Sequence, residues 1–154
     1  MKPATVPVAA SLSPDRLSVT LPIPPSINHQ YATVNGRRIL SATGRSYKAQ
    51  VAQQILLALA RGPSRTAFLR TVRSDFLRLS IRFHFPTPLR RDVDGGLKIT
   101  QDAVCEALAI NDNRILHIHL SKALDVTCPR IELSLARLSP GGRKTMPSHS
   151  PPQS

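Results

Sequence analysis

Residues 90–98 read RRDVDGGLK, and this stretch brings together two contrasting features of the chain. The 154 residues carry a formal net charge of +12, yet five of the nine acidic residues lie between positions 92 and 112. With one lysine against these five acids, the segment carries −4, and the remainder therefore carries +16. Carboxylates gathered inside a cationic protein suggest a site that holds a cation against a polyanion.

The length and composition predict one domain that buries a core without metal or disulfide staples. The pI is near 11.2, and arginines outnumber lysines by 16 to 5, which suits bidentate phosphate contacts and indicates nucleic acid or another anionic surface as the partner. No apolar run approaches the roughly 18 residues of a membrane span, so no membrane association is expected and a cytoplasmic location is the default. Cys105 and Cys128 lack CxxC spacing, and we interpret both as reduced, buried thiols.

The two ends of the chain are rich in proline and show no hydrophobic periodicity. We expect residues 1–14 and residues 139–154 to be disordered tails, with a single domain over residues 15–138.

The domain alternates between strand and helix patterns. Leucine and valine alternate over 16–21, and the Asn35-Gly36 pair between short β-prone runs predicts a hairpin. The pattern predicts, in order, a strand at 16–21, the hairpin at 31–40, a helix at 44–61, a strand at 76–85, a helix at 97–110, and strands at 115–123 and 129–137. This order indicates an α+β fold, with two main helices packed on a mixed sheet.

Two of these predictions concern charged and apolar faces. In the strand at 76–85, apolar residues take one face and the cationic Arg78 and Arg82 the other, which could line a DNA groove. In the strand at 115–123, Leu116, Ile118 and Leu120 are expected to point inward. Residues 63–75 are expected to form a loop whose arginines, Arg65, Arg70 and Arg73, either contact phosphate or are simply solvated.

The acidic segment itself allows two interpretations. Asp92 and Asp94 are two residues apart, so in extended backbone they project from one face, as paired metal ligands would. Helix capping explains one aspartate equally well, and a second less well. Lys98 either reaches a phosphate or forms an i,i+4 pair with Asp102 on the helix surface.

Two further features are ambiguous by themselves. Asp112 lies in the Asn-Asp-Asn break after the second helix, where such residues are common in turns. His117 and His119 alternate on one strand face, which is more typical of a polar face than of a metal pair.

Several ordered motifs together resemble the RusA-type Holliday junction resolvases. The first is RDVD at 91–94, followed by Lys98, Asp102 and Asn111-Asp112 at the spacing of that family. Upstream, LPIPPSIN at 21–28 and SATGRSY at 41–47 are similar to the segments that precede and open the first helix in that family. The similarity covers residues 17–137.

This resemblance implies a homodimeric, Mg²⁺-dependent endonuclease that cuts four-way DNA junctions and needs no small-molecule cofactor. It places catalytic and metal-binding roles on Asp92, Asp94 and Asp112 and a supporting role on Lys98. Arg91 matches a basic position, and with Arg90 and the arginines of 63–75 it is a candidate DNA contact. The chain departs from the family pattern at Gly95, where asparagine is usual, and at Asn111, where a second acid is common.

The length of the acidic helix constrains such a site. A helix from 96 to 110 is about 20 Å long, whereas ligands of one metal ion approach it within about 2–2.6 Å. Either the helix breaks early, or Asp112 works with Asp92 and Asp94 of a second subunit. In the second case the apolar stripe of Leu97, Val104 and Leu108 becomes a candidate dimer interface.

Two other functions remain open from the sequence. One is a catalytically inactive binder of branched DNA or other nucleic acid, and the other is a basic structural protein, such as a ribosome-associated one.

Overall fold

The computed structural model describes residues 9–87 and 93–138, with the side chains of Val93 and Asp94 left out. Five strands form one mixed sheet in the order β1-β2-β7-β5-β6, in which β5 and β6 are parallel and the other neighbours antiparallel. The strands are β1 (Ala10–Ser13), β2 (Arg16–Leu21), β5 (Leu77–Phe85), β6 (Ile115–Leu124) and β7 (Arg130–Arg137). This confirms the α+β class with a mixed sheet.

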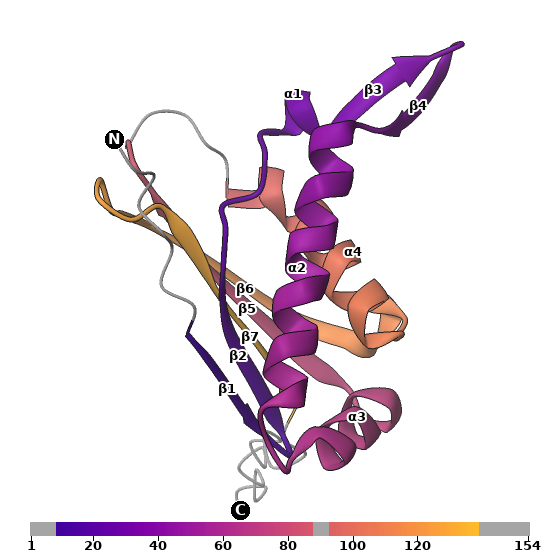
Figure 1. Ribbon diagram of the computed structural model, residues 1–154, viewed down its shortest axis with the longest axis vertical. Helices are drawn as coiled ribbons and strands as arrows, with labels where there is room; N and C mark the ends of the chain where they lie inside the picture. The colour runs from indigo at the N-terminus through magenta and orange to yellow at the C-terminus, as the bar shows by residue number, and fades with distance from the viewer. Residues whose placement is uncertain (1–8, 88–92, 139–154) are drawn as a thin grey trace, which may run out of the picture.

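The helices cover one face of the sheet and leave the other open (Figure 1). Two long ones, α2 (Ala42–Ala60) and α4 (Leu97–Leu108), pack against each other. The remaining helical elements are α1 (Ile27–Gln30), α3 (Arg65–Ser74) and the short 3₁₀ turns η1 (Val93–Gly96) and η2 (Asp112–Arg114).

The core lies between the helices and the inner face of the sheet. Alternate residues of β2, β5 and β7 are buried there, as in the fully buried Leu17, Leu79 and Leu135. The helices contribute residues spaced four apart, such as Val51 and Ile55 of α2. This alternation is what a sheet with one covered face requires.

The predicted hairpin is confirmed as β3 (Tyr31–Val34) and β4 (Arg37–Leu40). Asn35 and Gly36 both have positive φ, 50° and 74°, as a two-residue type I′ turn demands. This hairpin is a separate two-stranded sheet that projects beyond the end of α2 (Figure 1).

Local chemistry fixes the ends of the long helices. Ser41 caps α2 by accepting a hydrogen bond from the amide of Gly44, at 3.0 Å. Helix α4 ends because Ala109 adopts a left-handed conformation, φ 53°, and the amide of Ile110 turns back to the carbonyl of Cys105.

Three expectations were wrong. Residues 63–75 are not a loop, because Arg65–Ser74 form α3, whose Phe68 and Val72 are fully buried one turn apart. The N-terminal tail does not extend to residue 14, since β1 pairs with β2. Leu116 and Ile118 are not buried in the core but are 52% and 44% exposed, because β6 is an outer strand.

Candidate functional site

One half of the candidate site is η1, which precedes α4 and contains Asp94. The buried side chain of Gln30 donates to the carbonyls of Pro25 and Gly95, both at 2.8 Å. The hydroxyl of Thr100 donates to the carbonyl of Gly96 at 2.7 Å. The backbone that carries Asp94 is therefore held from both sides, by the segment after β2 and by α4.

Gly96 allows this close packing. A methyl group added to its Cα would lie 2.5 Å from Cγ of Pro24 and 3.0 Å from Cε1 of Phe83. By contrast, a methyl group on Gly95 would meet nothing within 4 Å. Only a residue without Cβ lets η1 pack against β5 in this way.

Several of the predicted residues cannot be placed. Arg90, Arg91 and Asp92 lie outside the described residues, and for Asp94 only the backbone is described. Lys98 is in the first turn of α4, with its side chain 75% exposed and its Nζ 3.4 Å from Oδ2 of Asp102. The structure thus shows the i,i+4 pair, on a lysine that solvent reaches freely.

The second half of the candidate site is η2, beyond the other end of α4. Asp112 is the first residue of η2 and is exposed. Asn111 caps this turn by accepting from the amide of Asn113 at 3.0 Å. Burial, and after it the negative charges of Asp112, Asp102 and Glu106, raise the pKa of the Cys105 thiol to about 11. The Asp112 carboxylate therefore lies near the C-terminal part of α4.

The two halves lie at opposite ends of the sheet. Gly96 packs on Phe83, which pairs with Lys122 of β6, whereas Asp112 leads into Ile115, which pairs with Leu77. Six residues of β5 separate these levels, or roughly 20 Å. Helix α4 is continuous between them, so an early helix break does not bring the acids together.

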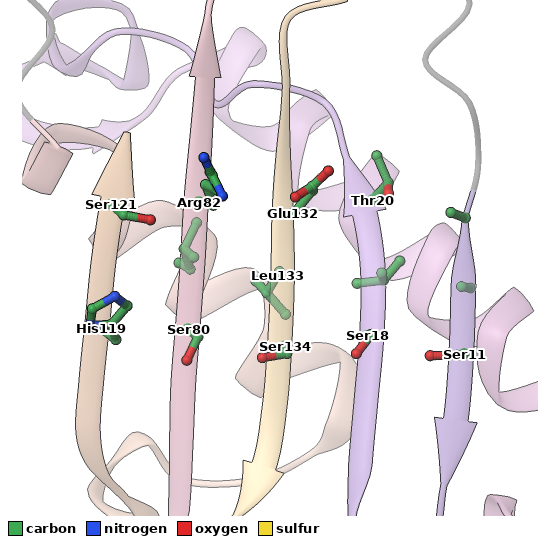
Figure 2. Close-up of a pocket in the computed structure, with 14 residues that line it drawn as sticks. Ser11, Ser18, Thr20, Ser80, Arg82, His119, Ser121, Glu132, Leu133 and Ser134 are labelled. Atoms are coloured by element: carbon green, nitrogen blue, oxygen red, sulfur yellow. The ribbon is translucent and has the colours of Figure 1, made fainter. Parts of the chain in front are cut away.

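No three His, Cys, Asp or Glu side chains within the described part of the chain are placed to hold a metal ion together. His117 and His119 lie level with Arg78 and Ser80 of β5, and Figure 2 shows His119 beside Ser80 and Ser121 on the open face of the sheet. The aspartates themselves offer the hard oxygen ligands that Mg²⁺ prefers. The donor chemistry fits such an ion, but η1, which contains Asp94, and Asp112 lie at opposite ends of the sheet within one chain.

The candidate dimer interface on α4 is also corrected. Val104 and Leu108 are at most 1% exposed, and Leu97 packs against the same core. The stripe is therefore intrachain core rather than a surface for a second subunit.

A cationic hollow of about 400 Å³ adjoins η1, and the sequence reasoning missed it. It is lined by Ile27, Gln30, Tyr31, Arg38, Gly95 and Lys98. The guanidinium of Arg38 lies over the Tyr31 ring, 4.6 Å from its centroid. The sequence feature that pointed to this hollow was the Arg37-Arg38 pair directly after the Asn-Gly turn.

A second group of arginines lies at the opposite end of the molecule. Arg65, Arg70 and Arg73 are exposed on α3, which ends just before β5 begins at Leu77. Since Leu77 pairs with Ile115, these arginines belong to the same end of the sheet as Asp112. Each candidate half-site thus has cationic side chains at its own end of the molecule.

Fold and charge first define a class of protein: a basic α+β domain with cationic side chains near both ends of one long helix. Comparison with known proteins narrows it. The family model described as endodeoxyribonuclease RusA matches residues 22–136. The chain therefore belongs to the RusA endodeoxyribonuclease family.

Individual relatives agree. The crossover junction endodeoxyribonuclease RusA of Escherichia coli strain K12 is 30% identical over 122 residues, which are 79% of this chain and 94% of the relative. The protein of the same name from Enterobacteria phage 82 is 28% identical over 121 residues, covering 78% of this chain and 93% of the relative. No helix in the described part of the chain is long and apolar enough to cross a membrane.

Proposed function

We propose that this chain is a structure-specific endodeoxyribonuclease that resolves four-way DNA junctions by Mg²⁺-dependent phosphodiester hydrolysis, in recombination and repair. Membership of the RusA family supports the reaction class. The observation that carries the mechanism is that η1, which contains Asp94, and Asp112 lie at the two ends of a continuous α4.

The active site is a composite of two subunits. Asp92 and Asp94 of one chain would hold Mg²⁺ together with the partner's Asp112. When bound, Mg²⁺ supplies Lewis-acid activation and a nucleophile at neutral pH. A two-fold homodimer then carries two such centres, which matches two symmetric strands to be cut in one junction.

Lys98 neutralises the scissile phosphate. Its ion pair with Asp102 is exposed, and such surface pairs contribute only about 0–1 kcal/mol. The lysine therefore leaves Asp102 at little cost when a phosphate approaches. Charge developing on that phosphate is where a positioned cation lowers the barrier.

The remaining cations grip the DNA backbone. Arg90 and Arg91 flank the first aspartate, Arg38 lines the hollow beside η1, and the three arginines of α3 lie at the Asp112 end. Contacts of this kind position the duplex arms and read little sequence, so binding should weaken strongly with salt.

Cleavage of a labelled four-way junction, with and without Mg²⁺, tests the proposed reaction. We expect paired nicks that require the metal and a preference for the junction over linear duplex of the same sequence. Binding without cutting would instead indicate a catalytically inactive member of the family. Equal binding to linear and branched DNA would indicate a general basic protein.

Mixing two inactive variants, Asp92→Asn and Asp112→Asn, tests the composite site. After subunit exchange, each mixed dimer holds one centre with all its acids, so about a quarter of the wild-type centres should recover. Asp92→Asn mixed with itself is the control. Absence of recovery after verified exchange would show that each subunit carries its own complete site.

A further inference from the structure

The hollow beside η1 has features that a contact with DNA phosphates alone does not explain. Its volume of about 400 Å³ falls within the range of about 300–1,000 Å³ that is usual for sites binding small molecules. Part of its wall is apolar, because it is lined by Tyr31 and by Ile27, a large apolar side chain that is 55% exposed. A hollow of this size and character suits one planar group of a ligand and is too small for a duplex.

Tyr31 and Arg38 form an ordered pair of planar groups at this hollow. The guanidinium carbon of Arg38 lies 4.6 Å from the centroid of the Tyr31 ring, and both residues lie on one face of the β3–β4 hairpin. Aromatic rings and guanidinium planes are the surfaces on which unpaired bases stack in protein complexes with nucleic acids. The N–H groups at the edge of the Arg38 guanidinium can still donate to a phosphate, so stacking is compatible with a backbone contact.

The polar side chains that line the hollow divide into two kinds. The amide nitrogen of Gln30 already donates to the carbonyls of Pro25 and Gly95, both at 2.8 Å, so it has no N–H group left for a ligand. The other two, Arg38 and Lys98, are cationic and exposed. Positive charge beside an apolar wall matches a ligand that is an anion with an apolar face, as a nucleotide is.

We propose that this hollow binds a single unpaired nucleobase of the DNA substrate, stacked on the Tyr31–Arg38 pair and next to the phosphate to be cut. The inference rests on the proposed function, because Gly95 of η1 and Lys98 line the same hollow. A base held there keeps its own phosphate close to Lys98 and to the turn that contains Asp94. Tyr31 and Arg38 then determine specificity for the DNA structure at the active site.

Such a hollow selects branched DNA over linear duplex. Extruding a base from a continuous duplex costs free energy, and this cost is smallest where the base is already unpaired. The stack of bases is interrupted at the point where four arms exchange strands, so a base is more easily extruded there. The hollow therefore favours a junction without reading its sequence.

A double-mutant cycle between protein and DNA tests the stacking. One change is Tyr31→Ala, and the other is an abasic site, placed in turn at each nucleotide around the branch point of a labelled junction. Fluorescence anisotropy in EDTA measures binding while no strand is cut. On the intact junction, Tyr31→Ala should bind about 5- to 150-fold more weakly, which is the range for the loss of one stack between a base and an aromatic ring. On the junction that lacks the base bound in the hollow, wild type and Tyr31→Ala should bind equally.

Three further variants separate stacking from other effects. Tyr31→Phe keeps the ring and should bind as wild type does. Arg38→Ala, at an exposed position, should show the same dependence on the same nucleotide, and it decides the matter if Tyr31→Ala does not fold. Ile39→Ala truncates a 42% exposed side chain on the opposite face of the hairpin and should leave binding unchanged. Circular dichroism reports whether each variant is folded.

The outcomes also separate this inference from the proposed function. Equal weakening on every abasic junction would overturn the base-binding hollow and indicate contacts with the backbone alone. No weakening by Tyr31→Ala or Arg38→Ala, or an equal loss in Ile39→Ala, would overturn it as well, even if junctions are cut. Coupling to one nucleotide in a protein that cuts no junction would overturn the proposed reaction and leave the hollow as a binding site for a base.

Discussion

At the residue scale, the two adjacent glycines of η1 have different roles. Gly96 is packed between Pro24 and Phe83, whereas Gly95 faces open space and contributes only its carbonyl, to Gln30. A side chain at position 95, such as the asparagine that the family resemblance implies, would meet open space. The close approach of η1 to β5 depends on Gly96.

Alanine at these two positions makes a matched pair. Gly96→Ala should lower the free energy of unfolding by about 1–3 kcal/mol, as overpacking does, and should slow junction cleavage by displacing η1. Gly95→Ala should change stability by less than about 1 kcal/mol, because the φ of Gly95 is not positive and a methyl group there would meet open space. Urea unfolding of both variants measures the difference. Equal destabilisation would contradict the packing role of Gly96.

The sequence could not predict which residues hold η1 in place, but it could predict the separation between Asp94 and Asp112. The hydrogen bond from Gln30 to Gly95 joins residues 65 apart, and no local pattern announces such a contact. The distance between the two ends of α4, in contrast, follows from helix rise alone. Sequence could therefore predict that Asp112 lies far from Asp94, but not what positions either turn.

At the element scale, predictability followed the length of each pattern. β5 alternates over nine residues and α4 repeats over three turns, so both were predicted nearly to their ends. α3 was missed because its fully buried pair, Phe68 and Val72, spans a single turn among three arginines. For β6, alternation predicted a strand correctly, but periodicity cannot reveal that a strand lies at the edge of a sheet.

The connection from β6 to β7 depends on one carboxylate. Asp125 pairs with Arg130 at 2.7 Å and accepts hydrogen bonds from the amides of Thr127 and Cys128 and the Thr127 hydroxyl. The Arg130 guanidinium and, next, these donors hold the pKa of Asp125 far below its usual range. The negative charge of Asp125 thus organises the turn that returns the chain from the edge strand to the middle of the sheet.

This charge predicts a specific acid sensitivity. A lowered folded-state pKa stabilises the fold above the unfolded pKa of about 3.9, and this contribution is lost as the pH falls below that value. Asp125→Asn should therefore melt below wild type at pH 7, and the two melting temperatures should converge toward pH 2. Thermal unfolding followed by circular dichroism at pH 7, 4 and 2 measures this. A constant difference across that range would contradict a role for the charge.

At the scale of the whole molecule, positive charge is distributed over two ends and one open face. The hairpin and its Arg38 flank η1 at one end, and the arginines of α3 occupy the end that holds Asp112. Arg78 and Arg82 are both exposed, and they alternate with the buried residues of β5. They therefore lie on the open face, which the helices do not cover (Figure 1) and where Figure 2 shows Arg82. The proposed composite site would lie on the helix side, and we therefore expect the DNA to run along the two ends rather than across the open face.

Three sets of substitutions distinguish DNA bound along the two ends from DNA bound across the open face. Replacing Arg37 and Arg38 together, or Arg65, Arg70 and Arg73 together, by alanine should weaken junction binding and flatten its salt dependence by up to about 0.9 in the log–log slope per lost phosphate contact. Replacing Arg78 and Arg82 by alanine removes as much charge as the hairpin pair, yet should leave the slope near that of wild type. Fluorescence anisotropy of a labelled junction over a range of salt concentrations gives all the slopes. If the Arg78 and Arg82 variant showed the largest decrease in slope, the DNA would lie across the open face of the sheet. The placement of the two active centres on the helix side would then be wrong.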